Sequence, residues 1–152
     1  MGKSQAVSKL ILLLFAVLPL IVTAGCGRGD ANLPPRAKVT GLVTLDGRPL
    51  ATGMVMFVPD ADRQTNGPPA VGGIDATGHY ELTTDRQSSG DGAIIGFHRV
   101  RIVASEKPRN SMQSMSPSLI PLKYNDEAKS GLAFEVKANR ENVFDLKLSA
   151  EP

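Results

Sequence analysis

One stretch of this chain reads Phe97-His98-Arg99-Val100-Arg101-Ile102-Val103-Ala104. Its residues alternate in character, with Val100 and Ile102 on one side of an extended chain and Arg99 and Arg101 on the other. A period of two residues, rich in β-branched side chains, is typical of a strand that buries one face and wets the other. The stretch therefore predicts a β-strand in a half-buried sheet.

The same two-residue period recurs on both sides of this strand. Further strands are predicted at residues 38–45, 54–58, 70–75, 79–84, 132–136 and 143–148. Turn-forming residues separate them, as at Asp46-Gly47. No long window has a helical period, and only residues 124–130 are expected to make a helical turn. We predict an all-β domain, a seven-stranded antiparallel β-sandwich of Ig-like or prealbumin-like form, because two antiparallel layers cover each other's apolar faces.

The first 25 residues have the organisation of a secretory signal peptide. Lys3 and Lys9 precede an apolar run over residues 10–22, and small residues follow. The alternative is a transmembrane helix, which needs about 20 apolar residues. This run is shorter and contains Pro19, which disfavours a continuous helix. We predict a signal peptide over residues 1–25.

The single cysteine of the chain directly follows this segment. The tetrad Thr23-Ala24-Gly25-Cys26 resembles the lipobox of bacterial lipoproteins, from which Thr23 departs because Leu is usual there. The resemblance implies a diacylglyceryl group on the Cys26 thiol and, after cleavage, an acyl chain such as palmitate on its amine. Two or three chains anchor a protein at a membrane, whereas one chain alone binds only marginally. The alternative is a free cysteine beside an ordinary signal cleavage site.

Residues 26–37 are predicted to form a lipidated start and a flexible tether, and the domain is expected over residues 38–149. One cysteine excludes a disulfide within the chain, so the apolar core alone must stabilise the domain. The net charge is +2, from 17 basic and 15 acidic residues. Without Lys3 and Lys9 the mature part is formally neutral. A neutral domain has no general attraction to nucleic acid, and we predict no such partner.

The sequence shows no nucleophile paired with a base and no complete set of metal ligands, so no catalytic, cofactor-binding or metal-binding residue is predicted. By alternation, His79 is expected to face water and His98 to be partly buried, with no third ligand placed to complete a zinc site. Asp60 and Asp62 have the spacing that opens a calcium loop. The later acidic ligands of such a loop are missing, which favours a solvated loop.

Two further groups of residues bear on the surface of the domain. Arg99 and Arg101 would form a basic stripe with Lys147 if their strands adjoined. Met112 and Met115 are either a docking patch or fillers of a long loop.

Several segments carry a resemblance to a known family. They are Val39 to Leu50 with its Asp46-Gly47-Arg48-Pro49-Leu50 turn, Gly53 to Pro59, Ile74 to Tyr80, Pro121 to Tyr124 and Ser130 to Val136. These segments resemble the carboxypeptidase regulatory-like, or transthyretin-like, β-sandwich domains. The layout is similar to that of small lipoproteins of planctomycete bacteria. Gly96 to Ile102 departs from the family's third motif in the place of its aromatic residue. The resemblance implies the sandwich fold and no peptidase residues.

These observations lead to two functional hypotheses. The first is an exported lipoprotein, anchored through Cys26 to a bacterial membrane on its periplasmic or cell-surface face. Its β-sandwich module would have a non-catalytic structural or interaction role, with an envelope protein or glycan as partner. The alternative is a transthyretin-like protein that binds a small molecule or carbohydrate. A hydrolase of that fold is disfavoured by the scattered histidines and by the C-terminal sequence Leu148-Ser149-Ala150-Glu151-Pro152.

Overall fold

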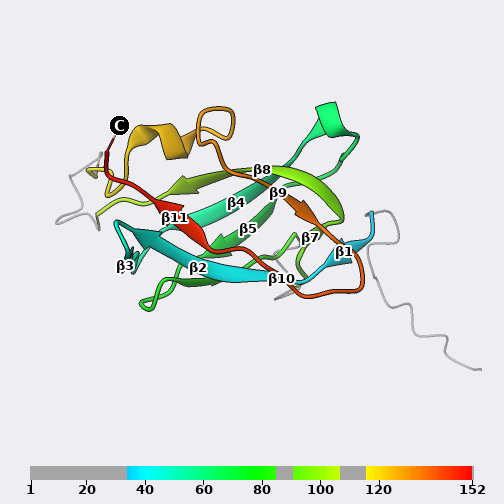
Figure 1. Cartoon of the computed structure of the whole chain (residues 1–152), viewed down its shortest axis with the longest axis horizontal. Helices are drawn as coiled ribbons and strands as arrows, with labels where there is room; N and C mark the ends of the chain where they lie inside the picture. The colour runs from blue at the N-terminus through cyan, green and yellow to red at the C-terminus, as the bar shows by residue number, and fades with distance from the viewer. Residues whose placement is uncertain (1–33, 85–90, 107–115, 152) are drawn as a thin grey trace, which may run out of the picture. The chain divides into compact units, whose positions relative to one another are not determined.

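The computed structural model describes residues 34–84, 91–106 and 116–151. Within these ranges the chain forms strands and two short 3-10 helices, which confirms the all-β class (Figure 1). The elements, in chain order, are β1 (Arg36–Ala37), β2 (Val39–Leu45), β3 (Arg48–Pro49), β4 (Met54–Pro59), η1 (Ala61–Arg63), β5 (Ala70–Gly73), β6 (His79–Glu81), β7 (Ala93–Ile94), β8 (Gly96–Val103), η2 (Leu122–Asn125), β9 (Ala133–Val136), β10 (Asn142–Val143) and β11 (Leu146–Leu148). The predicted signal peptide over residues 1–25 lies outside the described residues.

The strand on which the sequence argument began is β8, in an antiparallel sheet of order β5-β4-β8-β9. Its register with β4 runs from Met54 opposite Val103 to Pro59 opposite His98. Val100 and Ile102 are fully buried, whereas the intervening arginines are half-buried. The prediction of a strand with one buried and one wet face is confirmed.

A second sheet is built around β2. On one side β3 and β6 pair with β2 antiparallel, and on the other side β10 and β11 pair with it in parallel. The expectation of a wholly antiparallel arrangement is therefore wrong at the last strands. A two-residue period reports which face of a strand is buried but carries no information on strand direction. After β9 the chain crosses to the other sheet instead of turning back in a hairpin. The strands that follow, β10 and β11, can therefore pair with β2 in parallel.

The predicted strand over residues 143–148 forms two strands because Phe144 and Asp145 leave the regular ladder. The Leu42 amide donates a hydrogen bond to Asp145 Oδ1 at 3.0 Å, in place of a backbone carbonyl. The Tyr80 hydroxyl donates to the Phe144 carbonyl at 2.7 Å. Gly41, which lies opposite Tyr80 in the ladder, leaves room for that carbonyl because it has no side chain.

Together the described ranges contain eleven strands, and four of them are only two residues long. One of these, β1, pairs with β7, so that Arg36 lies opposite Ile94. Pairing thus begins inside the range 26–37 that was expected to be tether.

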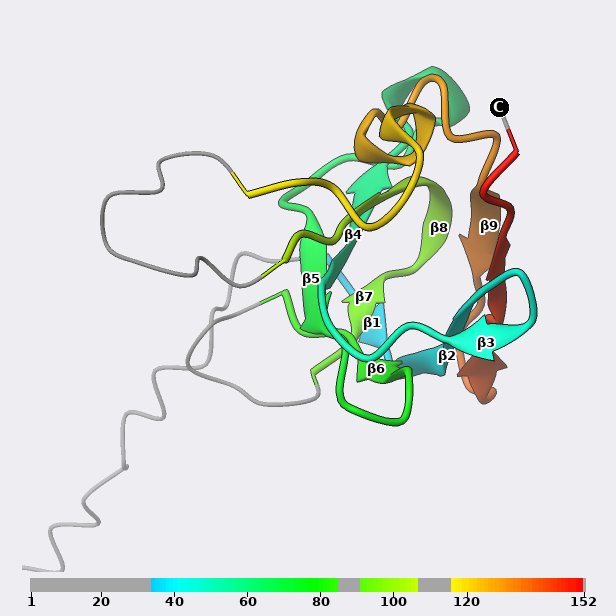
Figure 2. The same cartoon turned by 90° about the vertical axis from the view of Figure 1, so that its left-hand side faces the viewer.

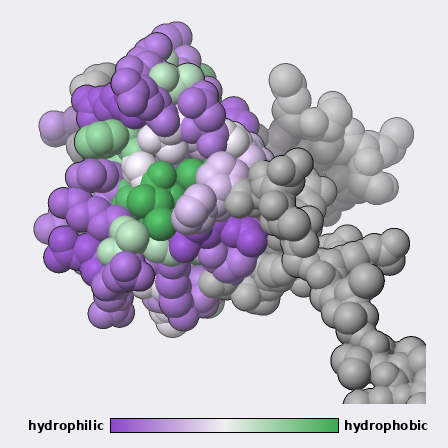
Figure 3. Space-filling model, turned by 90° about the vertical axis from the view of Figure 1, so that its right-hand side faces the viewer, coloured by the Kyte–Doolittle hydropathy of each residue, from purple (hydrophilic) through white to green (hydrophobic). Residues whose placement is uncertain are grey.

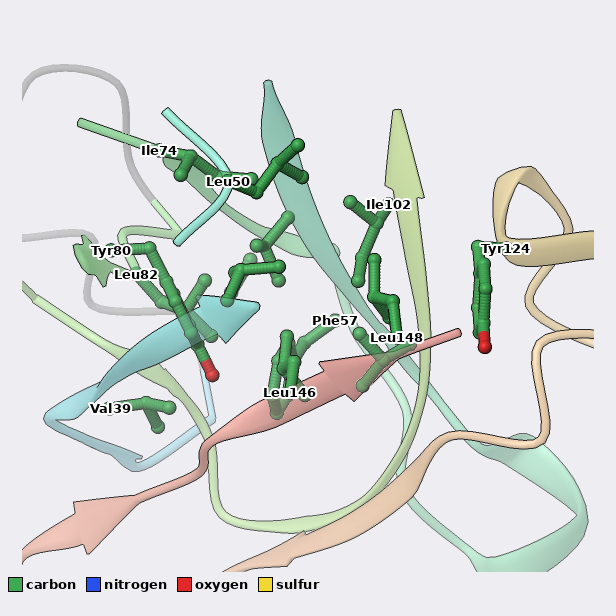
Figure 4. Packing of buried hydrophobic residues seen from close by; sticks show 14 of the residues in the cluster. Val39, Leu50, Phe57, Ile74, Tyr80, Leu82, Ile102, Tyr124, Leu146 and Leu148 are labelled. Atoms are coloured by element: carbon green, nitrogen blue, oxygen red, sulfur yellow. The ribbon is translucent and has the colours of Figure 1, made fainter. Parts of the chain in front are cut away.

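Side chains from both larger sheets fill one core (Figure 4). Phe57 of β4 lies with its ring centroid 6.5 Å from that of Tyr80 and 6.0 Å from that of Phe144. Val39, Leu82 and Leu146 are completely buried from the side of the β2 sheet. Burying a side chain of this size contributes roughly 1.5–3 kcal/mol, so this shared core is the main source of stability.

We predict that Gly41→Ala destabilises the protein by about 2–3 kcal/mol, as expected for overpacking. The added methyl group would overlap the Phe144 carbonyl and lie 2.9 Å from Tyr80 Cε1. Gly73→Ala in β5 is the matched control, because no atom lies within 4 Å of a methyl group added there. Urea unfolding of both variants measures the difference, and equal stability of the two would contradict the packing described for Gly41.

Candidate binding site

A cleft of about 250 Å³ lies where β4 ends, where β8 passes and where β9 begins. Its walls carry charged side chains from η1 and β8, including Asp60, Asp62, Arg63 and Arg99. Apolar and small residues at the start of β9 line the opposite side. Charged groups from several elements therefore converge in this cleft.

The Arg99 guanidinium joins the two aspartates of this cleft. Its Nη2 atom lies 3.1 Å from Asp60 Oδ1 and 2.7 Å from Asp62 Oδ2, and its Nε donates to Asp60 Oδ2 at 3.2 Å. Asp60 directly follows β4, and its backbone amide donates to the Phe97 carbonyl. Its own carbonyl accepts from Arg63 and Thr65, which closes the tight turn of η1. The turn therefore places a nearly buried carboxylate, 8% exposed, against Arg99.

The arginines and aspartates of the cleft pair with one another. Hydrogen bonding to Asp62, and then to Asp60, raises the pKa of Arg99 above its ordinary value. The Arg63 guanidinium lies 3.8 Å from Asp60 and 4.9 Å from the centroid of the Phe97 ring. Both carboxylate oxygens of Asp60 therefore lie against guanidinium groups. The arrangement offers polar contacts to a small ligand more readily than acid–base chemistry.

The possible calcium-loop start is accounted for by these contacts. Asp60 and Asp62 both direct their carboxylates at Arg99, so a guanidinium occupies the place in which a loop would hold a cation. Asp60 is buried, unlike the solvated residue that was expected. Among the described residues, no three or more His, Cys, Asp or Glu side chains form a group that could hold a metal ion.

The basic stripe considered for Arg99, Arg101 and Lys147 does not form. β8 and β11 belong to different sheets, so the condition that their strands adjoin is not met. Arg101 instead donates through Nε to Met56 Sδ at 3.2 Å and lies 3.9 Å from Glu127.

The two histidines lie in different sheets. His79 is exposed on β6, as predicted, and His98 on β8 is 1% exposed, more deeply buried than expected. The His98 ring lies 5.9 Å from Phe57, and its Nδ1 lies 3.1 Å from the Gly96 carbonyl, which places the proton on Nδ1. Its Nε2 is buried without a partner among the described residues. Burial lowers the pKa of His98, so the ring is a neutral core side chain.

A second hollow, of about 260 Å³, lies between β9 and β10 and was not anticipated from the sequence. Glu135 and Lys137 line it from one side and Phe144 from the other. Arg140 and Glu141 also line it, and the ring of Phe144 lies with its centroid 4.6 Å from that of Phe134. The signal that could have indicated it is the alternation of Phe134 and Val136 with charged residues, a pattern common on strands at a sheet edge.

The remaining predicted residues are not covered by the structure. Cys26, Met112 and Met115 lie outside the described residues. In the part of the chain that is described, no helix is long and apolar enough to cross a membrane.

Comparison with known proteins assigns no family to this chain. No family model matches it, and no curated protein matches it. Among solved structures it is similar to a 9R-lipoxygenase from Cyanothece PCC8801, with 14% sequence identity and a TM-score of 0.38. The alignment covers 76% of this chain and 16% of the lipoxygenase chain. A likeness of this size carries no argument about fold or function.

We predict that Arg99→Met lowers the melting temperature by a few degrees or more, because it leaves the buried Asp60 carboxylate with only the more distant Arg63. Asp62→Asn is the control, since Asp62 is 81% exposed and its loss leaves the Asp60 contact in place. Thermal unfolding near neutral pH compares the variants. A larger effect for Asp62→Asn than for Arg99→Met would contradict the central role of Asp60.

The neutral state of His98 predicts a pH-dependent stability. Its folded pKa lies below the ordinary value of 6.5, so the unfolded chain binds the proton more readily. Stability from this residue is present above pH 6.5 and is lost as pH falls below it, by up to about 1.4 kcal/mol per pH unit. Hydrogen bonds also lower the pKa values of Asp75 and Asp126, from an ordinary value of 3.8, so their contribution is lost at more acid pH.

Urea unfolding at several pH values between about 7.5 and 5.5 tests this expectation. His98→Leu should flatten the dependence, and His79→Gln should leave it unchanged. A profile that does not change in His98→Leu would show that the imidazole is not buried as a neutral group.

Proposed function

We propose that the protein is an exported lipoprotein with a prealbumin-like sandwich domain that has a non-catalytic interaction role at the bacterial envelope. One observation carries the proposal. An apolar run over residues 10–22 ends in Ala24-Gly25-Cys26, which places the only thiol of the chain where lipid attachment requires it. Two or three acyl chains on Cys26 would then anchor the protein to the membrane.

The non-catalytic role is supported by how the polar residues of the domain are used. The Asp60 and Asp62 carboxylates contact Arg99, and His98 packs against Phe57 within the core. These groups fix the ends of β4 and β8 and are not arranged as a nucleophile beside a base. In the described part of the chain, the sheet edges and the two hollows beside β9 are surfaces open to a partner.

Binding of a small polar molecule or a sugar is the second candidate, and the charged cleft favours it. A cleft of about 250 Å³ has room for a group of roughly one sugar ring, and Asp62 and Arg63 stand exposed at it. A panel of monosaccharides and small acids, tested by calorimetry on the wild type and on Asp62→Ala, would separate this role from an interaction with protein.

The anchor is tested by labelling expressing cells with an alkyne-tagged palmitate. We expect label on the wild type and none on Cys26→Ser, with the mass of the mature wild-type N-terminus accounting for Cys26 plus its acyl groups. Thr23→Leu restores the usual lipobox residue and should increase the processed fraction. Equal label on wild type and Cys26→Ser would overturn the proposal.

A further inference from the structure

Among the described strands, β9 lies at the end of its sheet and pairs with β8 alone. In the turned view of Figure 2 it stands at one side of the layer that begins with β5, in agreement with the strand order β5-β4-β8-β9. Gly96 lies opposite Val136 and His98 opposite Phe134, and the Val100 amide donates to the Leu132 carbonyl at 2.9 Å. Residues 132, 134 and 136 therefore direct their backbone groups toward β8.

Backbone groups alternate along an antiparallel strand, so Ala133 and Glu135 direct their N–H and C=O groups away from β8. Within the described ranges, no backbone hydrogen bond uses these four groups. Both residues are exposed. The edge of β9 thus presents two donors and two acceptors to solvent, in the spacing of a strand.

The window of free backbone groups ends sharply at Lys137. The Lys137 amide donates to Asn142 Oδ1 at 2.8 Å, and its carbonyl accepts from Asn142 Nδ2 at 3.1 Å. Asn142 is 4% exposed, so these contacts are part of the folded core of the connection. A second strand placed beside β9 can pair at Ala133 and Glu135 and must leave the sheet at Lys137.

Side-chain space is available at both ends of this window. Ala133 lines the charged cleft, and Glu135 lines the second hollow together with Phe144. Val143 is 53% exposed at the same hollow. Figure 3 shows a hydrophobic patch on one face of the molecule, bordered in part by hydrophilic residues and in part by residues of intermediate hydropathy.

We propose that the edge of β9 binds an extended peptide segment of a partner protein by strand addition. Backbone groups at strand spacing are matched by another extended polypeptide, whereas a glycan has no regular alternation of amide donors and carbonyl acceptors. The segment's residue opposite Phe134 turns toward the rings of Phe134 and Phe144 and is apolar. The flanking residues stand beside Glu135 and Ala133 and are β-branched or basic. This inference rests on the interaction role proposed above and names its partner.

A second copy of the chain fits this edge less well. Two β9 strands would pair through only two residues each, because Asn142 closes the window on both copies. Such a contact buries far less than the roughly 800 Å² per partner of a stable interface. Lys137 Nζ also lies 3.4 Å from Glu135 on this edge, and edge charges are a common device against self-association. A flexible segment pairs through the same two residues, but its side chains can also enter both hollows.

The test uses the processed full chain in detergent and a phage-displayed library of random dodecapeptides. We expect enriched sequences with alternating apolar and β-branched residues and no central proline. The synthetic form of the most enriched peptide should slow amide exchange at Ala133 and Glu135 by about tenfold or more, while exchange at Lys137 stays as slow as before.

Glu135→Pro is the decisive variant. It removes the outward N–H, which β8 does not use, and proline is tolerated at such edge positions. We expect peptide affinity to fall about tenfold or more, whereas Glu135→Thr, which keeps the N–H, should bind within about threefold of the wild type. If Glu135→Pro lowers the melting temperature, Ala133→Pro repeats the test at the other outward residue.

Several outcomes would overturn the inference. They are no enriched peptide, equal affinity for the wild type and both proline variants, or protection that maps away from β9. Proline-sensitive dimerisation in sedimentation without peptide binding would assign the edge to a second copy instead. Loss of acyl label is read separately, so the anchor can fail while peptide pairing holds, and the reverse.

Discussion

The close approach of Gly41 to the Phe144 carbonyl sets the arrangement of the rest of the domain. β2 is the central strand of its sheet, and the last segment of the chain pairs with it on both sides of Gly41, which leaves space for the Phe144 carbonyl between β10 and β11. Tyr80 comes from the opposite neighbour, β6, and spans the strand to donate its hydroxyl proton to that carbonyl. Burial raises the pKa of Tyr80, and the nearby Asp145 charge adds to this effect. The hydroxyl therefore stays protonated and remains a donor.

The open edge of β9 and the hollow beside it depend on the connection between β9 and β10. After β9 the chain must cross to the other sheet to lie beside β2, and Asn142 secures the crossing. Its amide donates to the carbonyls of Lys38, Lys137 and Arg140 at 3.1–3.2 Å, which joins both sheets to the connector. The same amide ends the free window of β9 and shapes the hollow beside Phe144. The edge of β9 is thus open because the chain continues into the β2 sheet and, among the described residues, adds no further strand beside β9.

The alternation of apolar and polar residues predicted which side chains are buried. It could not predict the direction of a strand or a contact between residues distant in the sequence. The alternation around Val100 and Ile102 predicted β8, its buried face and the position of His98 on it. The parallel direction of β11 was beyond it because that direction depends on where the chain crosses after β9. The break at Phe144 was beyond it because the Phe144 carbonyl fits against Gly41, which is distant in the sequence. For the sites, Asp60 was interpreted as a solvated loop residue. Its partner Arg99 is distant in sequence, and only the register of β4 with β8 brings the two together.

A membrane anchor would compensate for the low affinity expected of strand pairing at β9. A window of two residues forms few hydrogen bonds, and each net bond contributes only about 0.5–1.5 kcal/mol, so the pairing alone is weak. If the partner resides in the same envelope, an anchor at Cys26 would hold both proteins near one surface and raise their effective concentration, to about millimolar for short linkages. Occupancy of the edge at the membrane is then higher than the same affinity gives in free solution. A short, charge-flanked edge also resists the non-specific strand pairing that a longer apolar edge would invite at such a surface.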